Sequence, residues 1–270
     1  MDLSAMTVAE IRQLYRALEQ SGDQGSNLLQ AMSRDSRVGV RQLYDTLQKR
    51  RLQVINEEKR LEDLLCYEKR LWASGVELVA GVDEAGRGPL AGPVVAAAVI
   101  LPPRVRIYQL NDSKQLSPAK RKALAFQIKN SGAWAIGVST VKEILNLNIY
   151  HASMLAMRRA LAGLKGDPGH VLADGFAIPA LELPQTHIIG GDGKSASIAA
   201  ASIIAKETRD ELMELCHHLY PRYGFDRHKG YATAGHIEAL RRYGPCPLHR
   251  EGFAPVRREM RGVNYYCSTN

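Results

Sequence analysis

The stretch GVDEAGRGPLAGP, residues 81–93, joins the end of a hydrophobic run to two adjacent carboxylates and a glycine-rich turn. Residues 76–82 are predicted to form a buried strand, and residues 94–101 a second strand. Successive side chains of a strand point to opposite faces, so Asp83 and Glu84 can reach one site only if the first strand ends there. The glycines of the turn would provide that end, because glycine adopts backbone angles that are closed to other residues. The stretch therefore predicts a functional site at a strand end.

Strands and helices alternate along the chain after this stretch. Ser117 followed by Pro118 is typical of a helix N-terminus, and Thr140 with Glu143 has the spacing of a capping box. The predicted helices span residues 117–128, 149–164 and 195–220, and the predicted strands span residues 134–139, 170–173 and 187–189. This alternation predicts an α/β fold in which helices flank a sheet and the site lies at strand ends.

The segment before the opening stretch is predicted to be helical. Helices are expected at residues 7–20 and 38–72. The longer one nearly keeps a heptad repeat of apolar residues, but three charged residues interrupt it: Arg50, Glu57 and Glu68. A coiled-coil dimer is therefore the weaker interpretation. We expect a helical appendage that packs on the main domain.

These patterns divide the chain into three parts. Residues 1–76 are the helical N-terminal extension, with a boundary at Ser74-Gly75. Residues 77–256 are the main domain, including a C-terminal helical part. Residues 257–270 form a polar tail that is expected to be disordered.

Composition places the chain among globular proteins. At 270 residues and 45% hydrophobic, it can bury a full core. Its four cysteines are scattered without a C-x-x-C pair, which argues against a zinc site or a disulfide framework and favours a reducing cytoplasm. No apolar run approaches the roughly 20 residues of a membrane span, and the charged N-terminus does not resemble a secretory signal. We therefore expect a cytoplasmic protein without membrane contact.

The net charge of +8 is unevenly distributed. Residues 1–76 hold 12 basic and 11 acidic residues, whereas residues 221–270 hold 9 basic and 4 acidic residues. A basic excess on a domain that also carries an acidic cluster indicates a polyanion held near a cation site. A solvated basic surface without a partner is the alternative.

Acidic residues stand beside glycine at three separated places. Asp83 and Glu84 precede Gly86, and two further pairs are Asp174-Gly175 and Gly191-Asp192. A single Asp-Gly pair is usually an ordinary turn, but three pairs after apolar strands indicate side chains that meet in the fold. Carboxylates without His or Cys partners suit Mg²⁺ or Mn²⁺. Two such ions about 4 Å apart could support phosphodiester hydrolysis by a two-metal mechanism.

Two nucleotide-binding motifs are excluded by their spacing. Gly193-Lys194-Ser195 matches the end of a P-loop, but the earlier glycine of that motif would fall on Ile188. The glycines of the opening turn begin a dinucleotide fingerprint, but its third glycine would fall on Ala91. We therefore expect neither a P-loop nucleotide site nor a dinucleotide cofactor.

Further motifs accompany the opening stretch in order along the chain. They are GVDEAGRG at 81–88, Asp112-Ser113-Lys114, Ala173-Asp174-Gly175, GDGKS at 191–195, AAASIIAK at 199–206 and Lys229-Gly230-Tyr231. With them, residues 77–256 resemble ribonuclease HII, the prokaryotic type 2 ribonuclease H family, in its long form with an N-terminal extension. The resemblance implies a ribonuclease H-like mixed sheet flanked by helices. It also implies that four acids bind metal and carry catalysis: Asp83, Glu84, Asp174 and Asp192.

The same resemblance implies a binding site for ribose. The turn Gly86, Arg87 and Gly88, together with Tyr231, would sense the ribonucleotide. A turn without bulky side chains lets the backbone approach the 2′-hydroxyl, which distinguishes RNA from DNA. Two lysines are candidate phosphate contacts: Lys114 and Lys194. Gly193 stands where the family has alanine, which loosens the turn beside Asp192 without removing a functional group.

The expected function is that of an endoribonuclease dependent on Mg²⁺ or Mn²⁺. By the same resemblance, its partners would be RNA–DNA hybrids and duplex DNA with embedded ribonucleotides, and its products 5′-phosphate and 3′-hydroxyl ends. A monomer is expected. The alternatives are a non-catalytic hybrid-binding protein and a different two-metal nuclease, such as a junction resolvase. The basic residues Lys49, Arg50 and Arg51 suggest that the extension helps to hold the substrate. Three histidines in the basic C-terminal region are expected to make packing or backbone contacts without catalysis: His228, His236 and His249.

Overall fold

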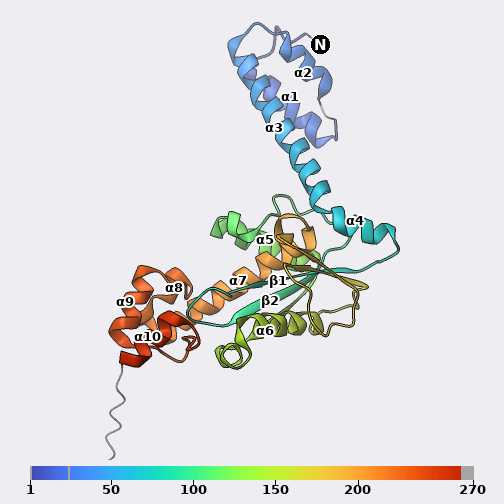
Figure 1. Cartoon of the computed structure of the whole chain (residues 1–270). Coiled ribbons are helices and arrows are strands. Elements are labelled where there is room, and N and C mark those ends of the chain that lie inside the picture. Colours follow the sequence, from blue (N-terminus) through green and yellow to red (C-terminus); the bar gives the residue numbers. More distant parts are fainter. Residues whose placement is uncertain (1, 24, 263–270) are drawn as a thin grey trace, which may run out of the picture. The chain divides into compact units, whose positions relative to one another are not determined.

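The computed structural model describes residues 2–23 and 25–262 (Figure 1). The chain divides into two compact units, Met1–Arg60 and Leu61–Asn270. Within the described residues, no helix combines the length and the apolar character needed to cross a membrane. The second unit contains the sheet and all of the predicted site residues.

The first unit is a small helical assembly. It contains α1 (Val8–Gln20), α2 (Ser26–Ser33) and most of α3 (Val38–Leu64). Thr7 and Glu10 form a capping box at the start of α1, so the predicted first helix is confirmed. Its core is built from residues of all three helices: Ile11, Tyr15, Leu28, Leu29, Met32, Val40, Leu43 and Leu47.

The prediction of one continuous helix over residues 38–72 is wrong, because the helix is interrupted at Leu65. The chain turns there and continues as α4 (Cys66–Ala73). Apolar residues on the two sides of the turn belong to different clusters: Leu61 and Leu64 pack with α5 and α7, whereas Leu71 packs near the strand ends. The turn lets both sets be buried, which one straight helix would not.

The second unit is built on a five-stranded mixed sheet of order β3-β2-β1-β4-β5. Its strands are β1 (Val79–Ala85), β2 (Val94–Ile100), β3 (Ala133–Ser139), β4 (His170–Asp174) and β5 (Gln185–Ile188). The first three strands are antiparallel neighbours, whereas β4 and β5 run parallel to β1. The ends of β1 and β4 therefore reach the same edge of the sheet.

Two long helices cover the faces of the sheet. Figure 1 shows α6 (Val141–Ala162) and α7 (Ala196–Leu219) on opposite sides of β1 and β2. Residues of β2 alternate between them: Ala97 and Val99 pack in the cluster formed with α7, and Ala96 and Ala98 in the cluster formed with α6. Strand β2 is buried along its whole length because both of its faces are covered.

The predicted helix starts are confirmed. Ser117 is the N-cap of α5 (Pro118–Ser131), and Thr140 with Glu143 forms the capping box of α6. Asn148 interrupts α6 with a φ of 66°, and its Oδ1 accepts hydrogen bonds from the next turn at Tyr150 N (3.0 Å) and His151 N (3.2 Å). A second helical segment thus begins at 149, as predicted.

The C-terminal part of the second unit is helical. It contains α8 (Phe225–His228), α9 (Ala234–Tyr243) and α10 (Ala254–Gly262). Three short 3₁₀ turns complete the second unit: Ser113–Gln115, Gly191–Gly193 and Pro221–Tyr223. Residues 257–262, expected in a polar tail, belong to α10, and the rest of that tail, 263–270, lies outside the described residues.

Candidate active site

The four predicted acids come from three neighbouring elements. Asp83 and Glu84 lie on β1, Asp174 is the last residue of β4, and Asp192 lies in the 3₁₀ turn after β5. The register of β1 and β4 pairs Val82 with Ala173, so Asp83 and Asp174 occupy the next position on adjacent strands. The sheet thus gathers residues that are far apart in the sequence at one edge.

The expectation that β1 ends before its acids is wrong. The strand continues through Ala85, and Asp83 and Glu84 pair with Ala97 and Ala96 of β2. Their side chains therefore leave opposite faces of the strand. The charge of Asp174, at the end of the adjacent strand, nevertheless acts on both. The strand ends only at Gly86, which has a φ of 99°.

Burial and neighbouring negative charges raise the pKa of three of these acids, Asp83, Glu84 and Asp192. Burial, followed by the charges of Glu84 and Asp174, holds the pKa of Asp83 well above its usual range. Burial raises the pKa of Glu84 to about 7, although Arg87 acts against this shift. Burial also raises the pKa of Asp192, and the charge of Lys114 opposes it. The site therefore favours an added positive charge.

Hydrogen bonds hold the acids and their turn. Lys114 Nζ lies 3.2 Å from Asp192 Oδ2, so this predicted phosphate contact is at the acids. Gly191 N donates to Asp174 Oδ1 at 2.6 Å, which ties the turn to β4. Lys194, the other predicted phosphate contact, instead donates from Nζ to Ile189 O at 2.8 Å.

The donor set suits a hard divalent cation. Four carboxylates supply only oxygen ligands, and this is the preference of Mg²⁺ and Mn²⁺. Throughout the part of the chain that the structure describes, no three His, Cys, Asp or Glu side chains are grouped as a finished metal site. The ammonium group of Lys114 stands beside Asp192 and supplies positive charge there.

Two buried arginines donate hydrogen bonds to backbone carbonyl oxygens of the glycine-rich turn. Arg250 donates to Gly86 O (2.6 Å), Arg87 O (2.9 Å) and Gly92 O (2.9 Å). Arg209 donates to Pro93 O (3.0 Å), Ala91 O (3.1 Å) and Lys229 O (3.0 Å). Their side chains are at most 1% exposed. Neither arginine was predicted from the sequence, although Arg209 carries a signal: it is a charged residue on the buried face of α7, four positions after Ala205.

Tyr231 lies beside the same turn, as the sequence analysis expected. A Cβ atom added to Gly88 would lie 3.9 Å from Tyr231 Cε1. The tyrosine ring is 42% exposed, and Lys206 Nζ and the Arg209 guanidinium carbon lie 5.6 and 5.9 Å from its centroid. The ring is thus accessible and held between the turn and the cations of α7.

A groove of about 570 Å³ extends from Tyr231 along α5 and α7. Its basic lining includes Lys122, Lys206, Arg227 and Lys229. Acidic residues also line it, and Arg121 forms ion pairs with two of them, Glu207 and Asp210. The groove therefore combines two exposed cations, Lys122 and Arg227, with a buried, internally neutralised floor.

The three C-terminal histidines make the expected packing and backbone contacts. His236 Nδ1 lies 2.8 Å from Tyr231 O, and its Nε2 lies 3.1 Å from His249 Nε2. His228 Nε2 lies 2.7 Å from Tyr223 O. Burial, with the neighbouring His236, lowers the pKa of His249 to about 4. These histidines support the segment that presents Tyr231.

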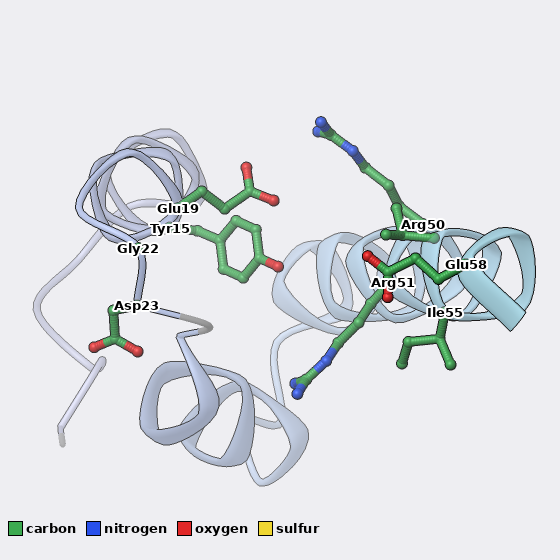
Figure 2. A pocket seen from close by; sticks show the side chains of 9 residues that line it. Tyr15, Glu19, Gly22, Asp23, Arg50, Arg51, Ile55 and Glu58 are labelled. Atoms are coloured by element: carbon green, nitrogen blue, oxygen red, sulfur yellow. The ribbon is translucent and has the colours of Figure 1, made fainter. Parts of the chain in front are cut away.

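The first unit has a separate pocket of about 340 Å³. Figure 2 shows the Tyr15 ring pointing from α1 toward α3, where Arg50 and Arg51 project in different directions. Glu19 and Glu58 also line the pocket. The basic residues of α3 thus share their surroundings with carboxylates.

Comparison with known proteins divides the chain between residues 72 and 80, so that α4 falls in the N-terminal match although it belongs to the second structural unit. Residues 80–256 match the ribonuclease HII family, and residues 7–72 match the ribonuclease HII N-terminal domain. Ribonuclease HII of Pelotomaculum thermopropionicum is 55% identical over 258 residues, covering 94% of this chain and 96% of that protein. Ribonuclease HII of an Anaeromyxobacter species is 51% identical over 257 residues, covering 95% and 81%. The crystal structure of ribonuclease H2 from Pyrococcus horikoshii has a TM-score of 0.60 at 28% identity, covering 68% of this chain and 98% of that one.

Proposed function

Because the chain belongs to the ribonuclease HII family and is a nuclease of the ribonuclease H type, we propose that it cleaves RNA–DNA hybrids and duplexes with embedded ribonucleotides by a two-metal mechanism. The predicted family and the ribonuclease H-like fold are confirmed by the family match and the likeness to the P. horikoshii enzyme. The proposal is carried by one observation: carboxylates gather at a sheet edge, next to a glycine turn whose Gly88 faces an accessible tyrosine, Tyr231.

The acids are proposed to hold Mg²⁺ or Mn²⁺. All four offer oxygen donors, and added positive charge would offset the burial and the repulsion that raise the pKa of Asp83 and of Glu84. Bound cations supply an activated water and stabilise the leaving oxygen in phosphodiester hydrolysis. The protein would keep the carboxylates in position for these cations. Ser202 donates a hydrogen bond to Asp83, and Gly191 N donates one to Asp174.

The turn and Tyr231 are proposed to recognise the ribose. Gly88 leaves space beside the Tyr231 ring, where a sugar could lie against the aromatic face with its 2′-hydroxyl near the backbone. Arg87 completes the predicted set and pairs with Glu84 at 3.3 Å, so sensing and catalytic groups are in contact. We propose that Lys114, which pairs with Asp192, contacts a phosphate at the acids. Lys194 would have to give up its hydrogen bond to Ile189 O before it could contact a phosphate.

A duplex with one embedded ribonucleotide tests the proposal. With Mg²⁺ or Mn²⁺, the protein should cut it to leave 5′-phosphate and 3′-hydroxyl ends. Asp83→Asn should abolish detectable cleavage because it removes a charged ligand. Asp167→Asn, in an exposed turn, is the matched control and should cleave like the wild type. Absence of wild-type cleavage, or full activity of Asp83→Asn, would overturn the proposal.

The same assay separates the competing functions. A hybrid-binding protein without catalysis would retain the duplex in metal without turnover. A junction resolvase would cut all-DNA four-way junctions and leave ribonucleotides intact. The presence of all four acids favours turnover, and the space beside Tyr231 favours ribose as the recognised group.

The remaining expectations concern the setting of the enzyme. We propose that it works in the cytoplasm as a monomer. We also propose three functional regions: a helical extension at 1–76, a catalytic domain at 77–256 and a polar tail at 257–270. The extension is proposed to assist substrate binding through Lys49, Arg50 and Arg51.

A further inference from the structure

A buried carboxylate on α4 contacts the start of α7. Glu68 is 2% exposed and belongs to the second unit, as α7 does. Its Oε1 accepts hydrogen bonds from Ser195 Oγ (2.6 Å), Ser197 N (2.9 Å) and Ser197 Oγ (2.6 Å). Apolar residues of α4, of α7 and of strands β1, β4 and β5 form one cluster between the same elements: Tyr67, Leu71, Trp72, Val79, Leu172, Ile188 and Ile198. Helix α4 is therefore fixed to the layer that carries the acids.

From Ser195, hydrogen bonds continue to the predicted metal ligands. Ser195 N donates to Gly191 O at 2.8 Å, and Gly191 N donates to Asp174 Oδ1 at 2.6 Å. Asp192 lies within the turn that the first of these bonds closes. Three successive contacts thus join Glu68 to Asp174 and enclose Asp192.

The contact does more than cap a helix. Ser195 already caps α7, because its Oγ accepts a hydrogen bond from Ile198 N at 3.2 Å. The single hydroxyl hydrogen of Ser195 is directed to Glu68, which fixes the rotamer that this cap requires. A carboxylate is also favoured at a helix N-terminus by the helix dipole. Glu68 therefore determines the conformation of Ser195, from which the turn of Asp192 begins.

We propose that Glu68 is a positioning residue for Asp174 and Asp192, so that α4, although it lies in the segment matched by the N-terminal domain of the family, belongs to the catalytic machinery. The inference rests on the proposed function in so far as these acids hold divalent cations. It gives a role to a residue that the sequence shows only as an interruption of a heptad repeat.

Glu68→Ala and Glu68→Gln in the full chain test the inference, with Glu62→Ala as the control. Glu62 is an acidic residue of the same segment, but its side chain is 48% exposed and pairs with Lys69 and Arg106. In Glu68→Ala, the affinity for Mn²⁺, measured by calorimetry, should fall about tenfold, and so should kcat on the ribonucleotide duplex. Losses of this size are typical when a residue that orients metal ligands, without binding the metal itself, is removed. KM should change less than about twofold, because the substrate surface is unaltered.

The glutamine variant separates positioning from stability. It keeps an acceptor at Oε1 and places an NH₂ group at Oε2, which is buried and has no hydrogen-bond partner among the described residues. Glu68→Gln should therefore have a lower Tm than the wild type. Its kcat and its Mn²⁺ affinity should nevertheless be close to those of the wild type and well above those of Glu68→Ala. Hydrogen exchange of a peptide covering 188–198 should be faster in Glu68→Ala than in Glu62→Ala.

Two results would overturn the inference. One is a Glu68→Ala protein whose Tm is lowered but whose kcat and Mn²⁺ affinity, measured at a temperature where it is folded, equal those of the wild type. The other is an unchanged exchange rate over 188–198. Neither Mn²⁺ binding nor exchange requires cleavage, so a wild type that fails to cut ribonucleotides would refute the proposed function and leave the role of Glu68 to be decided by these measurements.

Discussion

Arg250 donates from Nη2 to the carbonyl oxygen of Gly86 at 2.6 Å, although 164 positions separate the two residues in the chain. The same guanidinium group also reaches Arg87 O and Gly92 O. A guanidinium group can do this because its five N–H donors lie in one rigid plane. The C-terminal helical part thereby holds the turn after β1 in one conformation, and the turn carries the groups proposed to sense ribose.

Arg250→Lys should show that geometry as well as charge matters here. A lysine ammonium group cannot reach all the carbonyl oxygens that the planar guanidinium group bonds. Some of the carbonyls of Gly86, Arg87 and Gly92 would therefore lose their hydrogen-bond donor. We expect a loss of about 3 kcal/mol in the free energy of unfolding in urea. Cleavage at an embedded ribonucleotide should also fall. Arg257→Lys, on an exposed side chain that donates to Gly252 O, is the control and should change neither.

The two glycines of the turn should respond differently to alanine. Gly86 has a φ of 99°, and an added Cβ would lie 2.0 Å from Arg209 Nε, which its hydrogen bond to Pro93 O holds in place. Gly86→Ala should therefore cost about 3 kcal/mol or more in stability. At Gly88 the nearest atom to an added Cβ is Tyr231 Cε1 at 3.9 Å. Gly88→Ala should fold normally and lose about tenfold in kcat/KM, because its methyl group fills the space beside the ring.

Gly193→Ala is the control for both glycine variants. No atom lies within 4 Å of the Cβ that it would add, and its φ is not in the positive region. The substitution should leave activity unchanged. It should stabilise the protein by about 0.5 kcal/mol, because alanine lowers the conformational entropy of the unfolded chain. A Gly88→Ala protein as active as Gly193→Ala would contradict the placement of ribose beside Tyr231.

Glu84→Gln should stabilise the metal-free protein while it abolishes cleavage. The folded-state pKa of Glu84, about 7, lies above its ordinary value of 4.5. The folded state therefore binds more protons between these values, and its stability falls as pH rises through the window. Glutamine removes this loss, so the variant should be about 3 kcal/mol more stable than the wild type in urea with EDTA at pH 8, and equally stable near pH 4. Equal stability at pH 8 would contradict the raised pKa of Glu84, which burial and the charge of Asp174 produce.

Much of the site could be predicted because its parts have local sequence signals. Acids beside glycine mark the ends of β4 and β5, and capping residues mark the starts of α5 and α6. The path of β1 could not be predicted in the same way. Whether the strand ends at Val82 or Ala85 depends on its pairing with β2, which continues to Ala85–Val95.

Long-range contacts account for most of what the sequence did not reveal. Leu65 breaks a segment whose composition favours a helix throughout, because its two halves are buried in different clusters. Arg209 and Arg250 look like ordinary basic residues until the fold places backbone carbonyls around them. Glu68 is similar: its partners, Ser195 and Ser197, lie more than a hundred positions away.

His249 should make the protein less stable in mild acid. Its folded-state pKa, about 4, lies below the ordinary value of 6.5, because it is buried next to His236 and close to His228. The unfolded chain therefore binds more protons between pH 6.5 and pH 4, and stability falls as pH decreases through this range. From pH 7 to pH 5 we expect His249 to contribute a loss of about 2 kcal/mol in urea unfolding.

His249→Gln should reduce this pH dependence. His187→Gln, at an exposed position on β5, serves as the control and should keep the wild-type slope of stability against pH. If the slope between pH 5 and 7 is the same in all three proteins, then His249 does not carry the acid sensitivity.

A chain that begins at Leu61 should test the proposed role of the extension better than one that begins at Glu77. The longer version keeps α4 and Glu68, which belong to the second unit, whereas the shorter version loses both. We expect the chain 61–270 to cleave with a near-normal kcat at saturating substrate, and the chain 77–270 to have a lowered kcat. If the two chains have the same kcat, α4 has no part in catalysis.

Substrate affinity gives the second half of this comparison. If Lys49, Arg50 and Arg51 contact phosphates, removing residues 1–60 should weaken binding of an RNA–DNA hybrid and lower the slope of log Kd against log salt by about 1 to 3. The full chain with all three residues changed to glutamine should show the same reduced slope, because it loses the charges and keeps the helices. Unchanged affinity of the 61–270 chain across salt concentrations would refute a role of the first unit in holding the substrate. It would leave α4 as the part of the N-terminal segment that serves the reaction, acting through Glu68 on the acids and not on the nucleic acid.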